Sequence, residues 1–143
     1  MEPEEVALLD SLLEDGDVVP ALSLVALRDG EPVGHVVCSN AWVGETAVVG
    51  LGPLGVAPEQ QGRGVGSALM HAVLAAADAL AMPLVGLLGS VEYYARFGFV
   101  PATTLGIEPP DPAWQSYFQV RTLTVYDPHI VGVFRYAPAF GRG

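Results

Sequence analysis

Three alternating glycines constrain the fold of this chain more than any other feature. Gly62, Gly64 and Gly66 follow an apolar run that ends at Pro58, and an uninterrupted helix-forming segment begins at Ser67. This order predicts a strand, a tight loop and the start of a helix. The first N–H groups of such a helix have no internal partners, and the aligned peptide dipoles add partial positive charge there. Because glycine lets an anion approach the backbone and can adopt positive φ, the loop predicts a site for a phosphate or pyrophosphate.

Two common phosphate-binding motifs do not fit this loop. A P-loop ends in Gly-Lys-Ser/Thr, but the chain contains no lysine, so Arg63 supplies the full positive charge of the loop. A dinucleotide-binding fingerprint needs a third glycine where this chain has Ser67. It also needs an acidic residue at the end of the next strand, where 84–88 has none. We therefore expect a different phosphate ligand.

Another pair of motifs does fit. The pattern Gln-x-x-Gly-x-Gly at 61–66, between a strand and a helix, resembles the acetyl-CoA pyrophosphate loop of the GNAT family of N-acetyltransferases. The sequence Tyr-Tyr-Ala-Arg-Phe-Gly-Phe at 93–99 resembles the Tyr-x-x-x-Gly-Phe segment that follows the fifth strand of that family. The resemblance covers roughly 22–136. The Leu-Gly-Pro-Leu approach to the loop and the Arg-Tyr-x-Pro-Ala-Phe ending are similar to the YhbS-type subgroup.

The resemblance implies the GNAT fold, an α/β (mixed α+β) architecture with a central, mostly antiparallel sheet around a parallel β-α-β core. A chain of 143 residues is long enough for one core and short for two, so we expect a single domain over 1–143. GNAT domains usually begin with a strand and a helix ahead of the segment at which this sequence starts, and we expect the fold to lack them. Because proteins avoid open sheet edges, we expect a homodimer that covers this edge.

Hydrophobic periodicity, together with glycine and proline positions, predicts the individual elements. Helices are predicted at 4–13, 67–80 and 91–97. Strands are predicted at 22–27, 33–39, 46–56 and 84–88, with an Asp-Gly turn at 28–31, and a final strand pair at 117–126 and 131–136. We expect loops at 40–45, which carries Trp42, and at 100–116. The central helix is predicted to bury Leu69, Met70, Val73, Ala77 and Leu80.

The resemblance also implies the binding residues for acetyl-CoA. The pantetheine arm would lie against Leu54, Gly55 and Val56, whose backbone N–H groups would hold the thioester carbonyl. The remaining residues implied in CoA binding are Gln61, Gly62, Arg63, Gly64, Val65, Gly66, Ser67 and Phe97.

The implied catalytic residue is Tyr94, which matches the general acid of the family. A phenol with a pKa near 10 can protonate a departing CoA thiolate, whose thiol has a pKa of about 8.5. A packed aromatic role stays open for Tyr94 and more so for its neighbour Tyr93. No Asp, Glu or His lies on the strand 46–56, so the general base is left open among His35, Glu45 and Glu92.

The implied function is an acetyl-CoA-dependent N-acetyltransferase that acts on a primary amine of a small molecule or a protein. The absent N-terminal elements and the absent strand carboxylate keep a second reading open, a non-catalytic CoA-binding sensor or structural subunit. A third reading, a generic nucleotide-phosphate module, fits poorly because it does not explain the segment 94–99.

Composition excludes several other classes. Sixteen carboxylates against six arginines give a net charge of −10, so neither nucleic acid nor an anionic membrane surface is an expected partner. No apolar run approaches the length of a membrane span, and 1–5 lacks the basic start of a signal peptide, so we expect a soluble cytoplasmic protein. His35, His71 and His129 match no zinc spacing, so no metal is expected. Cys38 stands alone on an apolar strand and is expected to be packed.

Overall fold

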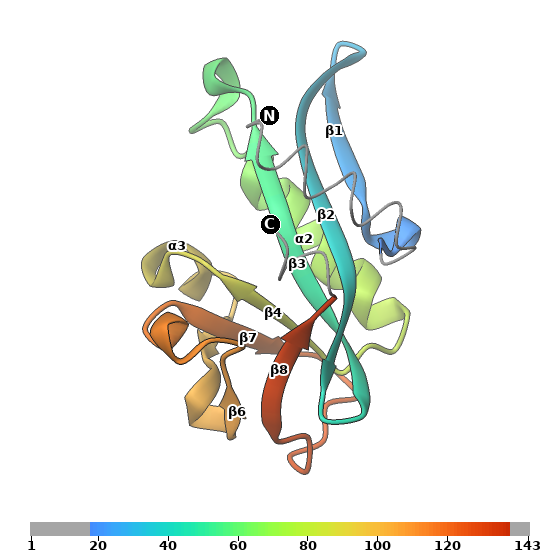
Figure 1. Ribbon diagram of the computed structural model, residues 1–143. Helices are drawn as coiled ribbons and strands as arrows, with labels where there is room; N and C mark the ends of the chain where they lie inside the picture. Colours follow the sequence, from blue (N-terminus) through green and yellow to red (C-terminus); the bar gives the residue numbers. More distant parts are fainter. Residues whose placement is uncertain (1–17, 138–143) are drawn as a thin grey trace.

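The computed structural model describes residues 18–137, which form an eight-stranded mixed sheet with helices packed against it (Figure 1). The strand order is β5-β7-β4-β3-β2-β8-β6, and β1 pairs with β2 outside this path. The strands are β1 Leu24–Arg28, β2 Glu31–Val43, β3 Thr46–Val56, β4 Leu84–Leu88, β5 Val100–Pro101, β6 Ile107–Glu108, β7 Phe118–Thr122 and β8 Gly132–Tyr136. The α-helices are α2 Val65–Ala79 and α3 Val91–Ala95, and the 3₁₀ helices are η1 Pro20–Leu22, η2 Pro58–Gln60, η3 Ala102–Leu105 and η4 Pro112–Trp114. The predicted helix at 4–13 lies outside the described residues.

The hairpin of β1 and β2 forms at the predicted Asp-Gly turn. Arg28 pairs with Glu31, and Asp29 and Gly30 have φ values of 53° and 82°. Two consecutive residues with positive φ form the turn that best matches the twist of a hairpin, which is why Asp-Gly is favoured there. β1 starts at Leu24 rather than at 22, because η1 occupies the preceding residues.

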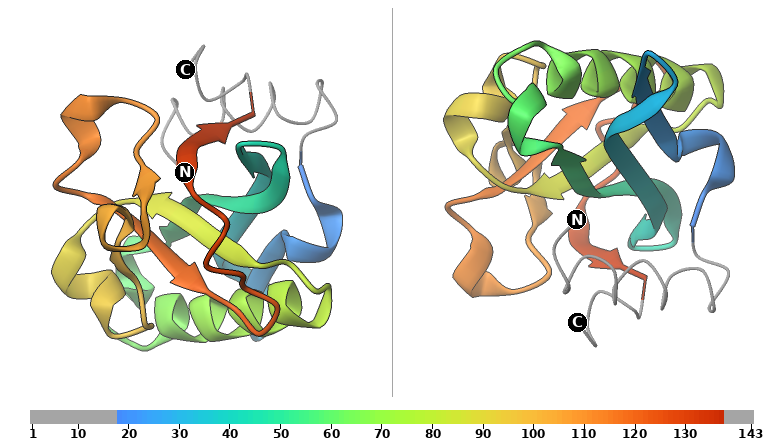
Figure 2. Two further views of the ribbon diagram at one scale, coloured as in Figure 1. Left: turned by 90° about the horizontal axis from the view of Figure 1, so that it is seen from below. Right: turned by 90° about the horizontal axis from the view of Figure 1, so that it is seen from above.

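The parallel core of the fold is the unit β3-α2-β4, as predicted. Helix α2 crosses from β3 to β4 and covers one face of the sheet (Figure 2). The β3–β4 ladder contains only two pairs, Val49 with Val85 and Gly50 with Gly86. Beyond them the two strands diverge, which leaves the second half of β3 without β4 as a neighbour (Figure 1).

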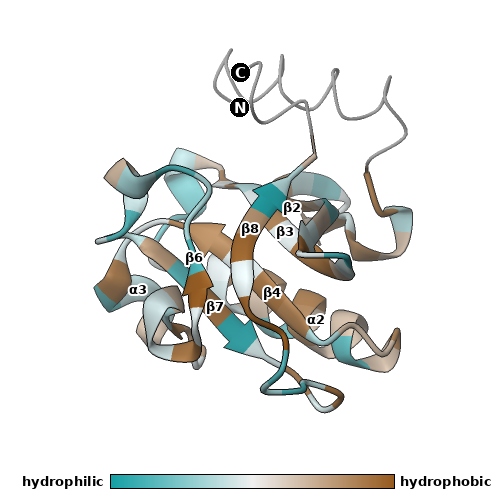
Figure 3. Cartoon of the chain, turned by 60° about the horizontal axis from the view of Figure 1, so that its bottom comes forward, coloured by the Kyte–Doolittle hydropathy of each residue, from teal (hydrophilic) through white to brown (hydrophobic). Residues whose placement is uncertain are grey.

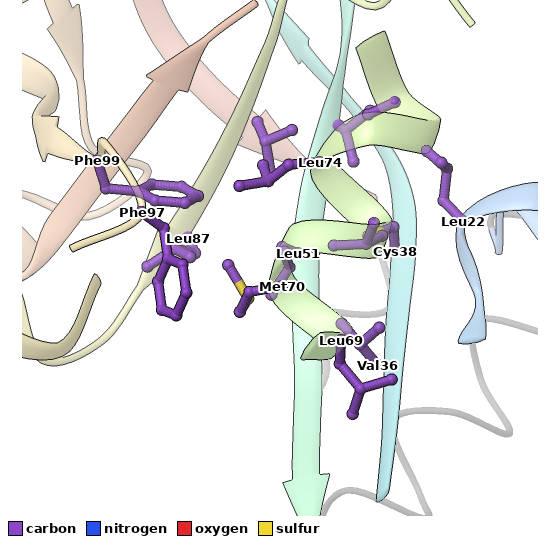
Figure 4. Packing of buried hydrophobic residues seen from close by; sticks show 14 of the residues in the cluster. Leu22, Val36, Cys38, Leu51, Leu69, Met70, Leu74, Leu87, Phe97 and Phe99 are labelled. Atoms are coloured by element: carbon purple, nitrogen blue, oxygen red, sulfur yellow. The ribbon is translucent and has the colours of Figure 1, made fainter. Parts of the chain in front are cut away.

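Two hydrophobic clusters lie on opposite faces of the sheet. Alternation along β4 separates them, because Val85 and Leu87 face α2 whereas Leu84 faces the other way. Figure 3 shows the apolar character of β4 between these layers. The α2-side cluster includes Leu22, Val36, Cys38, Leu51, Leu69, Met70, Leu74, Leu87, Phe97 and Phe99 (Figure 4). The opposite cluster contains Ala41, Val43, Val48, Leu84, Ala102, Ile107, Phe118, Val120 and Phe134.

The predicted loop at 40–45 is wrong, because β2 continues to Val43 and only a tight turn precedes β3. Asn40 and Gly44 are typical loop residues, but Ala41 and Val43 alternate into the buried cluster and pair with β8. Trp42 therefore lies on a strand, where the Arg135 guanidinium stands 5.8 Å from its ring centroid.

The predicted final strand pair is also wrong. β7 lies between β4 and β5, and β8 lies between β2 and β6, so the two strands never pair. Leu123 leaves the sheet after β7, and its N–H donates to the carbonyl of Pro83. The chain then passes to the sheet face opposite α2, where Phe134 is fully buried.

Helix bounds differ from the prediction by a few residues. α2 begins at Val65 and buries Leu74, whereas Leu80 is 49% exposed because it follows the last helical residue. The other four predicted core residues of α2 are buried. α3 ends at Ala95 rather than at 97, and Gly98 beyond it has a φ of +87°.

Burial makes Cys38 unreactive. Its side chain is 1% exposed, and loss of hydration raises the pKa of the thiol to about 12. Because the thiolate is the nucleophile, we expect the native protein to resist iodoacetamide at pH 8, and the urea-unfolded protein to react at the rate of an ordinary thiol. Mass spectrometry of timed samples measures both rates. Rapid labelling of the folded protein would contradict the packed assignment.

Candidate functional site

The glycine loop between β3 and α2 has an open backbone. Gly62 and Gly64 have φ values of +80° and +83°, which strongly favour glycine. No atom lies within 4 Å of the position that a Cβ atom would take at either residue. Gly66 differs, because it lies in the first turn of α2 without positive φ. The first two glycines therefore shape the loop, and its outer side is accessible.

The loop exposes several unused N–H groups. No side chain caps α2. Within the described chain, no backbone acceptor takes the N–H groups of Gly62, Gly64, Val65, Gly66 and Ser67. Exposed Arg63 lies among them. The Gln61 side chain has another partner, since its Nε2 donates to the Val56 carbonyl over 3.2 Å and ties the loop to β3. The arrangement can bind an anion through backbone groups.

The end of β3 adjoins this loop and has a free edge. Val56, Gly55 and Leu54 pair with β2, and within residues 18–137 no strand occupies their other edge. His35 lies opposite Gly55, and a Cβ atom at Gly55 would approach the imidazole to 2.5 Å. The gap between β3 and β4 is therefore bordered by backbone N–H and C=O groups that can bind an extended ligand.

Tyr94 is on α3, and its ring packs against the end of β4. A Cβ atom at Gly89 would lie 2.6 Å from the Tyr94 ring, and the ring centroid of Phe99 is 5.8 Å away. Burial raises the pKa of the Tyr94 phenol above its ordinary value, with a smaller contribution from neighbouring Tyr93. The phenol therefore keeps its proton throughout the neutral range.

Buried Gln119 supports the backbone against which this tyrosine packs. The sequence analysis did not predict this role. Its Nε2 donates to the Gly89 carbonyl over 2.9 Å, while the Gly89 N–H donates to the Tyr117 carbonyl over 3.1 Å. Gly89, against which Tyr94 packs, is thus held by both of its backbone groups. A lone glutamine on a short strand carries no sequence signal for this role.

A cavity of about 460 Å³ lies between α2, the end of α3 and β7. Its lining residues are His71, Leu74, Ala75, Asp78, Arg96, Phe97, Gly98, Arg121 and Leu123. Phe97 packs edge-on against His71 at 5.2 Å, and Arg121 Nε donates to the Phe97 carbonyl over 2.9 Å. The cavity therefore combines an aromatic side chain with two guanidinium groups. Arg121 lies far from the two motifs in sequence, so its presence here was not predicted.

Comparison with known proteins identifies the family. The sequence model described as the acetyltransferase (GNAT) family matches residues 2–99. The chain belongs to the GNAT family. The uncharacterized N-acetyltransferase YjhQ of Escherichia coli (strain K12) is 35% identical over 142 residues, which cover 94% of this chain and 78% of YjhQ. GNAT membership supports an acyltransferase activity for this chain.

Two solved GNAT structures are closely similar to this chain. YhbS from Escherichia coli, in complex with CoA, has a TM-score of 0.89 and 31% identity, over 96% of this chain and 78% of YhbS. A GNAT acetyltransferase from Brucella melitensis, in complex with acetyl-CoA, has a TM-score of 0.77 and 31% identity, over 98% of this chain and 80% of that chain. The predicted GNAT fold and the YhbS-like resemblance are confirmed.

The three candidate bases lie in different parts of this GNAT domain. His35 faces Gly55 at the free edge of β3, and exposed Glu92 lies on α3. Glu45 is at the turn between β2 and β3, roughly 30 Å from Leu54 at about 3.3 Å per strand residue. Glu45 is therefore too remote from the end of β3 to accept a proton there.

Residues 18–137 contain no cluster of three or more His, Cys, Asp or Glu side chains that would hold a metal ion. Over the same range, no helix has the length and apolar character needed to span a membrane.

Proposed function

We propose that this GNAT chain transfers the acetyl group of acetyl-CoA to a primary amine of a small molecule or a protein. The observation that carries the proposal is a juxtaposition at one end of the β-α-β core. There the free edge of β3 meets a loop of unused N–H groups, and Tyr94 lies at the matching end of β4. The loop would bind the phosphates of acetyl-CoA, the β3 edge would bind its thioester, and Tyr94 would protonate the leaving thiolate.

The glycine loop would hold the diphosphate of CoA. Backbone N–H groups at the start of a helix favour anions, and Arg63 adds a full charge. The proposed contacts are the backbone of Gly62, Gly64, Val65, Gly66 and Ser67 with the side chain of Arg63. Gln61 would act by tying the loop to β3. Phe97 and the cavity beside it would receive the adenosine end, since His71 lies about 9 Å along α2 from Val65 at ~1.5 Å per residue.

The pantetheine arm would lie along Leu54, Gly55 and Val56 as an additional strand. A backbone N–H there would hold the thioester carbonyl oxygen, which gains negative charge when the amine attacks the carbonyl carbon. Collapse of the tetrahedral intermediate forms the amide and breaks the C–S bond. The Tyr94 hydroxyl gives its proton to the leaving thiolate and regains one from the nitrogen, which loses protons as the amide forms.

Calorimetry with CoA and acetyl-CoA tests the binding half of this proposal. We expect association with both ligands, and roughly ten-fold or greater weakening in Gly64→Ala, because a left-handed alanine distorts the loop at a cost of about 1–2 kcal/mol. Gly44→Ala is the matched control. Gly44 also has positive φ and no atom within 4 Å of its Cβ position, but it lies in the distant β2–β3 turn. Absence of any heat with CoA would overturn the proposal.

A thiol-release assay tests the catalytic half. Acetyl-CoA and a panel of primary amines should yield free CoA thiol, which a disulfide reagent detects without interference from buried Cys38. The rival function, a CoA sensor or structural subunit, predicts tight acetyl-CoA binding with no thiol release from any amine. A nucleotide-phosphate module predicts binding of ATP in place of CoA.

We also propose a homodimer formed through β1. This strand pairs only with β2 in the part of the chain that the structure describes, and its Val25 and Leu27 side chains are 61% and 64% exposed. An unpaired strand edge with apolar side chains favours pairing with another chain. Sedimentation equilibrium should give twice the 15.0 kDa chain mass, and Leu27→Lys should reduce it. A wild-type monomer at high concentration would refute the dimer.

A further inference from the structure

The two adjacent tyrosines of α3 contact different halves of the proposed site. Tyr94 packs on Gly89 at the end of β4. Tyr93 reaches the glycine loop instead, because its hydroxyl oxygen lies 2.8 Å from the position of a Cβ atom on Gly66. α3 thus links the end of β4 to the first turn of α2.

The Tyr93 ring is held in place by its neighbours. It packs edge-on against Tyr94 and Phe97, with ring centroids 4.9 Å and 5.4 Å away. The Arg96 guanidinium lies 4.8 Å from the Tyr93 ring centroid, and the Ser90 hydroxyl accepts the Tyr93 N–H over 3.3 Å. A ring already ordered in this way loses little conformational freedom when its hydroxyl binds a ligand.

The Tyr93 hydroxyl lies where two proposed subsites meet. A Cβ atom built on Gly66 would lie 2.8 Å from the Tyr93 hydroxyl oxygen and 3.7 Å from Val56 Cγ2. The hydroxyl therefore lies between the first turn of α2 and the end of β3. It makes no hydrogen bond with any group in residues 18–137. An unused O–H donor therefore stands beside the unused N–H groups of the loop.

We propose that the Tyr93 hydroxyl donates a hydrogen bond to the diphosphate of CoA and helps the enzyme to select full CoA thioesters over shorter ones. The inference rests on the proposed acetyl-CoA site. It assigns adjacent tyrosines separate tasks, one at the phosphate and one at the sulfur. It also gives Gly66 a reason to lack a side chain, because a methyl group there would displace the hydroxyl.

Binding of two probes tests this assignment. We expect Tyr93→Phe to weaken CoA binding about ten-fold in calorimetry, since a hydrogen bond to a charged group is lost. Binding of S-acetylpantetheine, which lacks the diphosphate, should be the same in wild type and Tyr93→Phe. In turnover, KM for acetyl-CoA should rise while kcat is retained. Tyr126→Phe is the matched control, because Tyr126 packs against the cluster on the opposite face of the sheet.

A double-mutant cycle separates the hydroxyl from general packing. Gly66→Ala should weaken CoA binding in the wild type because the methyl group collides with the hydroxyl. In Tyr93→Phe, the same change should cost markedly less. Additive losses would overturn the proposed contact.

Each remaining outcome has a distinct meaning. Equal CoA affinity in wild type and Tyr93→Phe would overturn the proposal and show that Tyr93 serves only in packing. Tighter CoA binding in the variant would also overturn it, because the hydroxyl would then obstruct the diphosphate. Equal weakening for S-acetylpantetheine would overturn the assignment to the diphosphate. Failure of the wild type to bind CoA would refute the acetyl-CoA site itself and this inference with it.

Discussion

Tyr94→Phe should lower kcat roughly 10²- to 10⁴-fold, the range typical of a lost general acid, while calorimetry shows nearly unchanged affinity for acetyl-CoA. The expected split arises because the change removes only the hydroxyl. The ring that packs on Gly89 and Phe99 remains. Without the phenolic proton, CoA must leave as a free thiolate. Tyr126→Phe is the control, and it should retain kcat.

The pH dependence of wild-type turnover provides a second measurement of the same residue. Burial disfavours the phenolate, so the pKa of Tyr94 lies above its ordinary value of 10.0 and the acid stays protonated below that pH. The rate should therefore rise with pH as the amine substrate loses its proton, without a descending limb below about pH 10. A descending limb at pH 8 to 9, or unchanged kcat in Tyr94→Phe, would show that another group is the acid.

Local chemistry explains which parts of the fold were predictable. The Asp-Gly turn, the glycine loop and strand β3 depend on residues within a few positions of one another, and β3 was predicted with the bounds Thr46–Val56. β3 and β4 share a ladder of only two pairs and diverge beyond it, which opens the edge against which the pantetheine arm was expected to lie. These features carry the proposed phosphate and thioester sites.

Features formed by distant segments were not predictable in the same way. β8 and β7 have similar alternating patterns, and no local signal indicates that β8 pairs with 41–43 instead of β7. The same pairing converted the expected loop around Trp42 into strand. Gln119 and Arg121 are polar residues on β7 that a period-two pattern would place toward solvent. Instead, Gln119 donates to the Gly89 carbonyl before α3, and Arg121 donates to the Phe97 carbonyl after it. Their roles appear only when the tertiary contacts are known.

Phe134→Ala should destabilise the protein by about 3–5 kcal/mol, the cost typical of removing a buried phenyl ring from a core. Phe134 is 0% exposed, and its ring packs edge-on against Phe118 at 4.9 Å and Tyr136 at 5.1 Å. Urea unfolding followed by circular dichroism measures the change. Val133→Ala, on the same strand with a 43% exposed side chain, should alter stability by less than roughly 1 kcal/mol. A small loss in Phe134→Ala would contradict the assigned core.

Phe134→Ala should also affect the proposed pantetheine slot, because the aromatic rings of β8 lie next to it. Phe134 occupies the space above Gly86, and Tyr136 occupies the space above Gly50. These two glycines form the last pair of the β3–β4 ladder before the strands diverge. The β8 rings thus brace the point at which the proposed pantetheine slot opens. Gly86→Ala should destabilise the wild type by about 1–3 kcal/mol through overpacking, but less in Phe134→Ala, where the ring is absent. Additive losses would show that the ring and the glycine do not contact each other, and the proposed brace would fail.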